Sequence, residues 1–267
     1  MGRTCSLFVL VWCFFLFFIV LHSTLYYYQL FFYGHSFATQ PNNNSARDNH
    51  SRFKPTNLTF SQLYATYVPQ ANCPHLATIG SQGDGGKWTC NKLPAGCIVY
   101  AFGVGHEVSF ETQLSKETSC NIYSFDPDED NALLFKQLSK VHFEASKVGG
   151  RTNSSEGVYT VSDIMQRLHH SFVELVKMDI EGAEFAAIAD MVGKSSSSLP
   201  CQLLVEIHPT STEQANQMAD LLKVISDAGY YNFAKEVNPL YHQYCEFSFI
   251  HRACMANYDI SVASHTN

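Results

Sequence analysis

The sequence predicts an α/β fold, in which a mostly parallel sheet carries helices on both faces and an N-terminal transmembrane helix precedes it. From residue 73 onward, short apolar runs typical of buried strands alternate with segments of helical periodicity. The last two predicted strands, 230–237 and 245–250, are joined by a loop too short for a helical crossover, so they should pair antiparallel. An unbroken apolar run at residues 5–21 predicts the transmembrane helix.

The apolar run, CSLFVLVWCFFLFFIVL, contains no charged residue, and about 17 to 25 apolar residues span a bilayer. A tyrosine-rich stretch at 25–33 follows, and tyrosine favours the membrane interface. A cleaved signal peptide is one alternative, but no cleavage site of small residues follows the run. Residues 1–6 also fit an N-myristoylation pattern, with Cys5 as a palmitoylation candidate. The complete span favours a signal-anchor that contacts the lipid bilayer.

Charge around this run predicts its orientation. Arg3 precedes it and no basic residue follows until Arg47, which places the N-terminus in the cytosol and the bulk of the chain in the lumen. Glycosylation sequons support a luminal glycoprotein; they begin at Asn43, Asn49, Asn57 and Asn153. We therefore expect a single-pass type II membrane protein of the Golgi or the endoplasmic reticulum.

The predicted domain organisation has four parts. Residues 1–37 form a cytosolic stub, the membrane anchor and an aromatic collar; 38–71 form a stalk; 72–258 form the folded domain; and 259–267 form a tail. Two of the nine cysteines lie in the anchor, so seven remain for the luminal part, where some should form disulfides and at least one should not pair within the chain. Their spacing lacks the CxxC pairs of structural zinc sites.

Composition excludes two classes of protein. A chain with 46% hydrophobic and 15% charged residues is not predominantly disordered. A net charge of −7 and the absence of a Lys/Arg cluster argue against nucleic-acid binding.

The folded domain should contain seven strands of the main sheet. They are predicted at 97–102, 121–125, 141–145, 173–178, 203–207, 230–237 and 245–250. Helices are expected at 130–140, at 162–168 with Ser162 as N-cap, in a segment that ends at Gly193, and between a capping box at Ser211 and Gly229.

Ligands of parallel sheets bind at the carboxyl ends of the strands, so the residues there are the candidates for chemistry. Gly103 and Gly105 follow the first strand and would let backbone amides approach a cofactor, unless they form only a turn. Asp126 ends the second strand, where an acid can bind both ribose hydroxyls; helix capping is the alternative.

Acidic residues also crowd the end of the fourth predicted strand, in KMDIEGAE (177–184). Buried carboxylates are costly unless they bind or cap something, so Asp179 and Glu181 are functional candidates beside a capping role. His208 follows the next strand and is a general-base candidate. Asp179, Glu206 and His208 would also suit a divalent cation, but we predict no metal site.

The KMDIEGAE segment is similar to the KxDxEGAE signature of FkbM-type methyltransferases. Four further segments, in the same order along the chain, resemble the methyltransferase-like branch of that class, which includes membrane-anchored animal proteins. They are GDGGKWTC (83–90), VYAFGVGHEVSFE (99–111), SFDPD (124–128) and LLVEIHP (203–209). The resemblance covers roughly residues 73–252.

This resemblance implies a class I, Rossmann-like methyltransferase fold with a seven-stranded sheet whose last strand is antiparallel, and S-adenosylmethionine as cofactor. Gly103 and Gly105 would form the cofactor loop, Asp126 would bind the ribose and Glu111 would face the cofactor. Asp179 and Glu181 would face the methyl-transfer site. The chain departs from the usual first motif at Ala101, where many such enzymes carry an acid, and at Glu107, where a third glycine is common; Asp84 or Glu111 would then substitute.

These observations predict an S-adenosylmethionine-dependent methyltransferase that acts on a hydroxyl of a glycan or small molecule in the secretory pathway, with Asp179 or His208 as base. A luminal, metal-dependent glycosyltransferase is an alternative, because 126–128 and 128–130 match its DxD motif. A catalytically inactive binding protein with the same fold is another, because of the departures at Ala101 and Glu107. The sequence does not define the oligomeric state.

Overall fold

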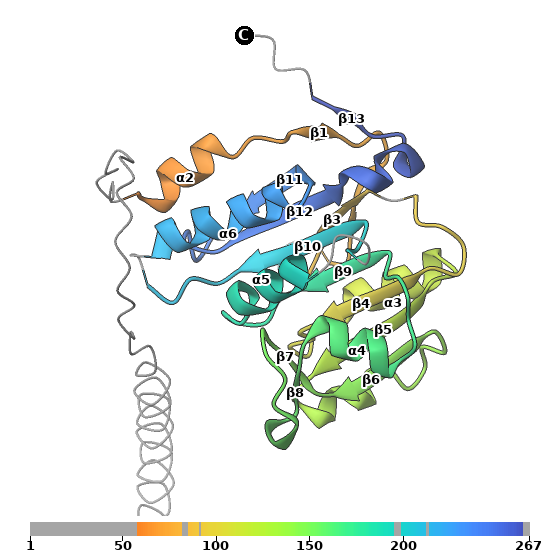
Figure 1. The fold of residues 1–267 in the computed structure, drawn as a ribbon. Helices are drawn as coiled ribbons and strands as arrows, with labels where there is room; N and C mark the ends of the chain where they lie inside the picture. The colour runs from red at the N-terminus through yellow and green to blue at the C-terminus, as the bar shows by residue number, and fades with distance from the viewer. Residues whose placement is uncertain (1–57, 82–84, 91, 195–198, 212–213, 264–267) are drawn as a thin grey trace, which may run out of the picture. The chain divides into compact units, whose positions relative to one another are not determined.

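A computed structural model of the chain describes residues 58–263 except 82–84, 91, 195–198 and 212–213 (Figure 1). These residues belong to the compact unit Lys54–Asn267. Its centre is a seven-stranded sheet with the order β11-β12-β10-β9-β4-β5-β6. The strands are β4 (Ile98–Phe102), β5 (Asn121–Asp126), β6 (Val141–Ala145), β9 (Leu175–Met178), β10 (Gln202–Ile207), β11 (Tyr230–Val237) and β12 (Cys245–His251).

Strand direction agrees with the class I arrangement. The pairs β4–β5, β5–β6, β4–β9 and β9–β10 are parallel, whereas β12 is antiparallel to both β10 and β11. All seven predicted strands are confirmed within two residues at each end. The last strand inserts antiparallel beside β10, as the resemblance implied.

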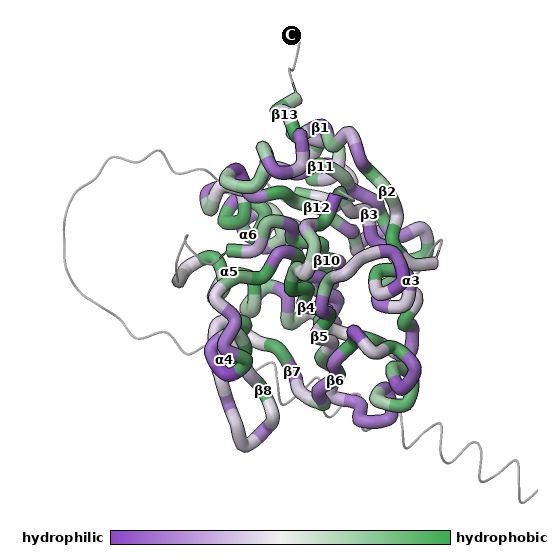
Figure 2. The backbone as a smooth tube through the Cα atoms, turned by 90° about the vertical axis from the view of Figure 1, so that its right-hand side faces the viewer, coloured by the Kyte–Doolittle hydropathy of each residue, from purple (hydrophilic) through white to green (hydrophobic). Residues whose placement is uncertain are grey.

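Helices cover both faces of this sheet. They are α2 (Phe60–Thr66), α3 (Ser109–Glu117), α4 (Val161–Arg167), α5 (Glu184–Lys194) and α6 (Ala215–Asp227), with 3-10 helices at Glu129–Leu133, Ser154–Glu156 and Arg252–Tyr258. In Figure 2, α4, α5 and α6 lie on one side of the strands and α3 lies on the other. The core divides in the same way, because Tyr100 and Phe102 of β4 pack in one apolar cluster and Val99 in the other.

Three short strand pairs lie outside the main sheet and were not predicted. They are β1 (Ala71–Asn72) with β13 (Ser261–Val262), β2 (Leu76–Ile79) with β3 (Lys87–Cys90), and β7 (Lys147–Val148) with β8 (Val158–Tyr159). Helix α2 and β1 fall in the range expected to be a stalk, yet Leu63 and Tyr64 of α2 are part of the core. The structured part therefore extends beyond both predicted domain limits, 72 and 258.

Three helix predictions need correction. The segment 130–140 is not an α-helix but a 3-10 helix followed by turns. Of the apolar residues whose spacing predicted it, Leu134 stays 40% exposed and Val141 already belongs to β6. The N-cap of α4 is Thr160, whose hydroxyl accepts from the Asp163 amide, and not Ser162. Helix α6 begins at Ala215, so Ser211 is not its N-cap.

Among the described residues, none of the helices combines the length and apolarity that a membrane span needs. The predicted anchor, residues 5–21, lies outside the part of the chain that the structure describes.

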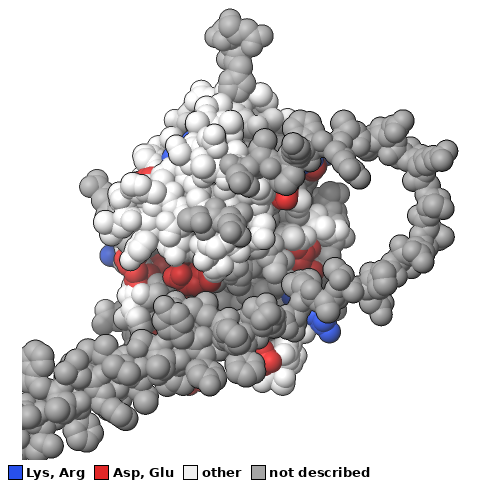
Figure 3. All heavy atoms as spheres, turned by 90° about the vertical axis from the view of Figure 1, so that its left-hand side faces the viewer, with Lys and Arg blue, Asp and Glu red and all other residues white. Residues whose placement is uncertain are grey.

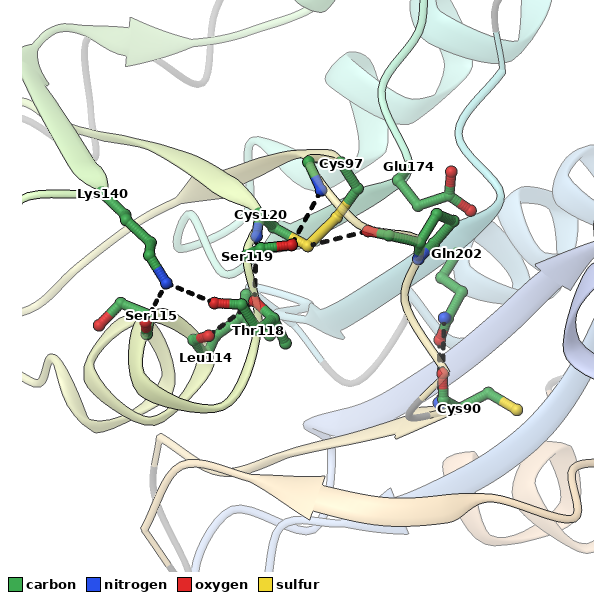
Figure 4. Close-up of a disulfide and its surroundings, with 12 residues drawn as sticks. Cys90, Cys97, Leu114, Ser115, Thr118, Ser119, Cys120, Lys140, Glu174 and Gln202 are labelled. Carbon is green, nitrogen blue, oxygen red and sulfur yellow. Dashed lines mark hydrogen bonds between the residues drawn. A yellow bond between two sulfur atoms is a disulfide. The ribbon is translucent and has the colours of Figure 1, made fainter.

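Disulfides fix the chain near the amino ends of the central strands. Cys97–Cys120 joins the segments that lead into β4 and β5, and Figure 4 shows it beside the end of α3. Cys201–Cys254 joins the residue before β10 to a 3-10 helix, and Cys73–Cys90 holds the end of β3, where the side chain of Gln202 also bonds to the Cys90 backbone. Cys245 is free and buried, so one of the seven cysteines outside the predicted anchor does not pair within the chain, as expected.

Replacing both Cys201 and Cys254 by alanine should lower the free energy of unfolding by about 4 kcal/mol, because the cross-link restricts a long loop of the unfolded chain. Its sequence separation is 53, against 23 for Cys97–Cys120, so the matched double replacement there should cost less, about 3 kcal/mol. Urea unfolding of the three proteins measures both effects. Unchanged stability without the Cys201–Cys254 disulfide would contradict this expectation.

Candidate active site

The loop after β4 is shaped by Gly103. This residue has φ +81°, and a Cβ on it would lie 1.7 Å from the backbone oxygen of Asp179, so the ends of β4 and β9 touch. Asp126, at the end of β5, accepts hydrogen bonds from the amides of Val104 (2.8 Å) and Gly105 (3.3 Å) through Oδ2. Its Oδ1 accepts from the Asp128 amide at 2.9 Å. The Gly103 amide donates to the Phe125 carbonyl at 2.9 Å, so the loop after β4 is hydrogen-bonded to the end of β5 along its length.

A pocket of about 280 Å³ opens beside this loop, at the carboxyl ends of β4, β5, β6 and β9. Its walls combine flat apolar groups with a polar rim. The lining residues are Phe102, Gly103, Phe125, Asp126, Pro127, Ser146, Lys147, Val148, Ile180, Glu181 and Ala183. The buried hydroxyl of Ser146 has no hydrogen-bond partner among the described residues, so it can bond to a ligand.

Glu181 lines the same pocket in a left-handed conformation, with φ +55°. A non-glycine residue in that conformation is strained and persists where its surroundings fix it. Glu184 supplies that constraint, because its carboxylate accepts from the amides of Ile180 and Gly182, both at 2.8 Å. The acidic segment thus contains both a predicted cap, Glu184, and a residue that faces the pocket.

A second group of charges lies next to the pocket and is centred on the buried ammonium of Lys87, the first residue of β3. Lys87 Nζ is 3.1 Å from Asp179 Oδ2, 3.6 Å from Glu206 Oε2 and 2.5 Å from Glu246 Oε1. These carboxylates belong to the end of β9, to β10 and to β12. We call Lys87, Asp179, Glu206, Glu246 and His208 the acidic cluster.

The charges of the cluster shift one another's pKa values. Burial favours the neutral amine of Lys87, but Asp179, Glu246 and Glu206 outweigh it and raise its pKa. Burial likewise disfavours the Asp179 carboxylate, but Lys87, Lys177 and His208 hold its pKa below the usual value. Burial raises the pKa of Glu246 to about 7, against the opposing effect of Lys87. Asp179 is therefore ionised at neutral pH.

His208 is the second cation of the cluster. Its Nδ1 lies 3.0 Å from Glu184 Oε1, and its Nε2 lies 3.8 Å from Asp179 Oδ1. Burial would lower its pKa, but the hydrogen bond and charge of Glu184, with Asp179 and Glu206, raise it to about 9. The ring of Tyr244 packs edge-on against it at 4.7 Å. At neutral pH His208 is an imidazolium that donates hydrogen bonds, which disfavours its predicted role as base.

The structure thus brings Asp179, Glu181 and His208 together, next to Gly103, Gly105 and Asp126. Glu111 lies apart, buried in the first turn of α3. Sequence analysis missed Lys87, Glu246 and Ser146 as site residues. For Glu246 the sequence offered a signal: it is a charged residue inside the apolar strand CEFSFIH (245–251), and a charge in such a place implies a buried partner of opposite charge.

Ligand atoms of Asp179, Glu206 and His208 lie within 4.8 Å of one another, a spacing that suits a metal ion. However, the Lys87 ammonium already contacts the first two of these side chains. A divalent cation would have to compete with that ammonium and with protonated His208. The donor set therefore fits a metal poorly.

The sequence profile of a family described as a methyltransferase domain matches residues 29–251. The chain belongs to this family. The match includes the cofactor loop, the pocket and the acidic cluster, so the protein is a methyltransferase by family. Comparison with curated proteins gave no match.

The chain is also similar to several solved structures. One is the fibrillarin pre-rRNA processing protein of Methanococcus jannaschii (6% identity, 58% of this chain, 66% of that chain, TM-score 0.43). Another is the 1,6-didemethyltoxoflavin-N1-methyltransferase of Burkholderia thailandensis (12%, 59%, 72%, TM-score 0.37). These likenesses are too distant to say anything of the substrate.

Family and pocket together support S-adenosylmethionine as the cofactor of this methyltransferase domain. The residues present fit that molecule: Gly103 leaves room for close backbone approach, Asp126 lines the wall where a ribose would lie, and the Ser146 hydroxyl has no other partner. The aromatic walls from Phe102 and Phe125 suit a purine.

Replacing Lys87 by methionine should lower the free energy of unfolding by about 3–5 kcal/mol, because three carboxylates would lose the buried cation that compensates them. The control, Lys136→Met, removes an exposed lysine and should change stability by about 0.5 kcal/mol or less. Chemical unfolding at pH 7 measures both. Equal stability of the two variants would refute the role given to Lys87.

His208 should titrate with a pKa of about 9, visible in the NMR shifts of its imidazole nitrogens. Since this lies above the unfolded value of about 6.5, the stability it contributes is full below pH 6.5 and is lost as the pH rises through about 9. Glu184→Gln should move the pKa down, because it removes the nearest opposing charge. A pKa of 6.5 or lower in the native protein would contradict this.

Proposed function

We propose that this methyltransferase transfers a methyl group from S-adenosylmethionine to a hydroxyl of a neutral, glycan-type acceptor in the secretory pathway. The observation that carries the proposal is the position of ionised Asp179. Its backbone contacts Gly103 of the cofactor loop, and its side chain, 21% exposed, is the most open carboxylate in contact with Lys87. Asp179 thus lies against the cofactor loop and is partly open to solvent.

In this proposal Asp179 orients the acceptor hydroxyl and takes its proton. Bound S-adenosylmethionine supplies an electrophilic methyl group on a sulfonium. As the acceptor oxygen bonds to that carbon and the carbon–sulfur bond breaks, the hydroxyl proton becomes strongly acidic. A carboxylate of lowered pKa is therefore a sufficient base, and Lys87 and His208 hold it ionised and fixed. Glu181 forms the pocket wall between the two substrates.

A second pocket, of about 180 Å³, adjoins the acidic cluster and suits such an acceptor. It is lined by Glu206, Glu236, Asn238, Pro239, Leu240, Tyr241 and Glu246. Its ionised carboxylates accept hydrogen bonds, and a ligand that donates them, as sugar hydroxyls do, would suit this lining. Leu240 and Tyr241, 83% and 55% exposed, offer apolar surface to a sugar ring.

The charge of this region argues against anionic acceptors. Figure 3 faces the side on which β10 ends and shows Asp and Glu side chains gathered in a band there. Sulfate, phosphate or uronate groups would meet this negative charge in a site with little solvent to screen it. Neutral glycans are the acceptor class that the lining favours.

Three observations support a secretory location. The three disulfides are typical of an oxidising compartment. Asn153 of the fourth sequon is exposed. The predicted type II anchor and the resemblance to the membrane-anchored branch of FkbM-type methyltransferases agree with the Golgi or endoplasmic reticulum. The glycosyltransferase alternative loses its motif, since Asp126 and Asp128 hydrogen bond to backbone amides and the family is a methyltransferase.

Asp179→Asn should reduce the rate of methyl transfer by about 10²–10⁴, because the amide cannot take the proton. Binding of S-adenosylhomocysteine should persist. The assay uses the full-length chain, S-adenosylmethionine with a tritiated methyl group, and neutral oligosaccharides beside their sulfated counterparts. Asp227→Asn, in an exposed pair with Lys223, is the control.

An unchanged rate in Asp179→Asn would refute its role as base. Preferred labelling of sulfated oligosaccharides would refute the acceptor class. Cofactor binding without transfer to any hydroxyl would favour the inactive binding protein.

A further inference from the structure

Glu111 is a buried carboxyl group without a partner. It lies in the first turn of α3, directly after the cofactor loop, and is 0% exposed. Neither of its carboxylate oxygens makes a hydrogen bond to any described residue. Most buried polar groups are satisfied, and a lone buried carboxylate is strongly disfavoured. Such a side chain therefore indicates a missing partner.

The neighbouring charges do not supply that partner. The charged side chains that act on Glu111 are Lys177 of β9, Glu107 in the turn before α3 and Lys87 of β3, and beside them only its own backbone amide lowers its pKa. Lys177 donates to the Gly103 carbonyl at 2.5 Å, and Lys87 binds the carboxylates of the acidic cluster. Glu107 is itself acidic and accepts from the amide and hydroxyl of Ser109. Burial raises the pKa of Glu111 and so favours the neutral acid over the carboxylate.

Ala101 explains why a carboxyl group is needed at this place. It lies on β4, where it pairs with Lys177 of β9, and it precedes Gly103 of the cofactor loop by two residues. Its methyl group cannot accept a hydrogen bond. The position before the cofactor loop on β4 thus offers no acid, whereas Glu111 of α3 lies within electrostatic reach of Lys177, whose ammonium bonds to Gly103 of that loop.

We propose that Glu111 is the residue that binds the α-ammonium group at the methionine end of the cofactor. The inference rests on the proposed function, because it requires S-adenosylmethionine in the pocket beside Gly103. The ammonium would supply the cation that Glu111 lacks. Its arrival would favour the ionised carboxylate, so that binding releases a proton from Glu111.

Calorimetric titration of the full-length chain with two ligands tests this. S-adenosylhomocysteine carries the amino-acid end, and 5′-methylthioadenosine lacks it. Glu111→Gln should weaken the first by about ten- to a hundred-fold, the usual effect of losing a charged hydrogen bond, and leave the second unchanged. Titrations in two buffers of different ionisation enthalpy should show proton release with S-adenosylhomocysteine in the native protein and none in the variant.

The control is Glu117→Gln, on the exposed end of the same helix, which should leave both affinities unchanged. Glutamine imitates the neutral acid, so the variant should fold, and thermal unfolding checks this. Equal affinities of native and Glu111→Gln protein for S-adenosylhomocysteine would overturn the inference. An equal loss for both ligands would also overturn it, since that indicates a structural role. If the native protein binds neither ligand, the proposed function itself fails.

Discussion

The buried ammonium of Lys87 is the interaction on which the functional edge of this domain depends. Three carboxylates from the end of β9, from β10 and from β12 approach it, and a group of buried carboxylates is costly without a compensating cation. The same contact anchors β3, which is not part of the main sheet. One charge therefore determines both the ionisation of Asp179 and the position of the strand that covers β10 and β12.

The amino ends and the carboxyl ends of the strands are stabilised by different interactions. Near the amino ends of β4, β5 and β10, disulfides fix the chain covalently, and Gln202 bonds to both backbone groups of Cys90. At the carboxyl ends, hydrogen bonds and ion pairs take over, because the groups there must meet ligands. Strand β3 connects the two ends, because its Cys90 forms a disulfide and its Lys87 belongs to the acidic cluster. The disulfide-bonded amino ends thus support the preorganisation of the charged groups at the carboxyl ends.

The seven main strands were predictable because each is a continuous apolar run, which parallel strands buried on both faces require. The strands β2 and β3 carry no such pattern, and a disulfide from Cys73, before β2, to Cys90, at the end of β3, adds to their pairing. Asp179 and His208 were found because strand ends are known places for ligands. Lys87 and Glu246 were not, because 159 residues separate them and only the tertiary structure brings them within 2.5 Å. The predicted helix at 130–140 failed because Leu134 stays exposed and Val141, the last apolar residue of the pattern, begins β6.

The structure gives the KMDIEGAE segment a physical explanation in which each charged residue has a different task. Lys177 holds the cofactor loop through the Gly103 carbonyl, and Asp179 packs its backbone on Gly103 while its carboxylate binds Lys87. Glu184 fixes the strained turn at Glu181 and also stabilises the protonated form of His208. Any displacement of this segment would move the cofactor loop and the acidic cluster together. The spacing of its charges therefore couples the geometry of the cofactor side to that of the acceptor side.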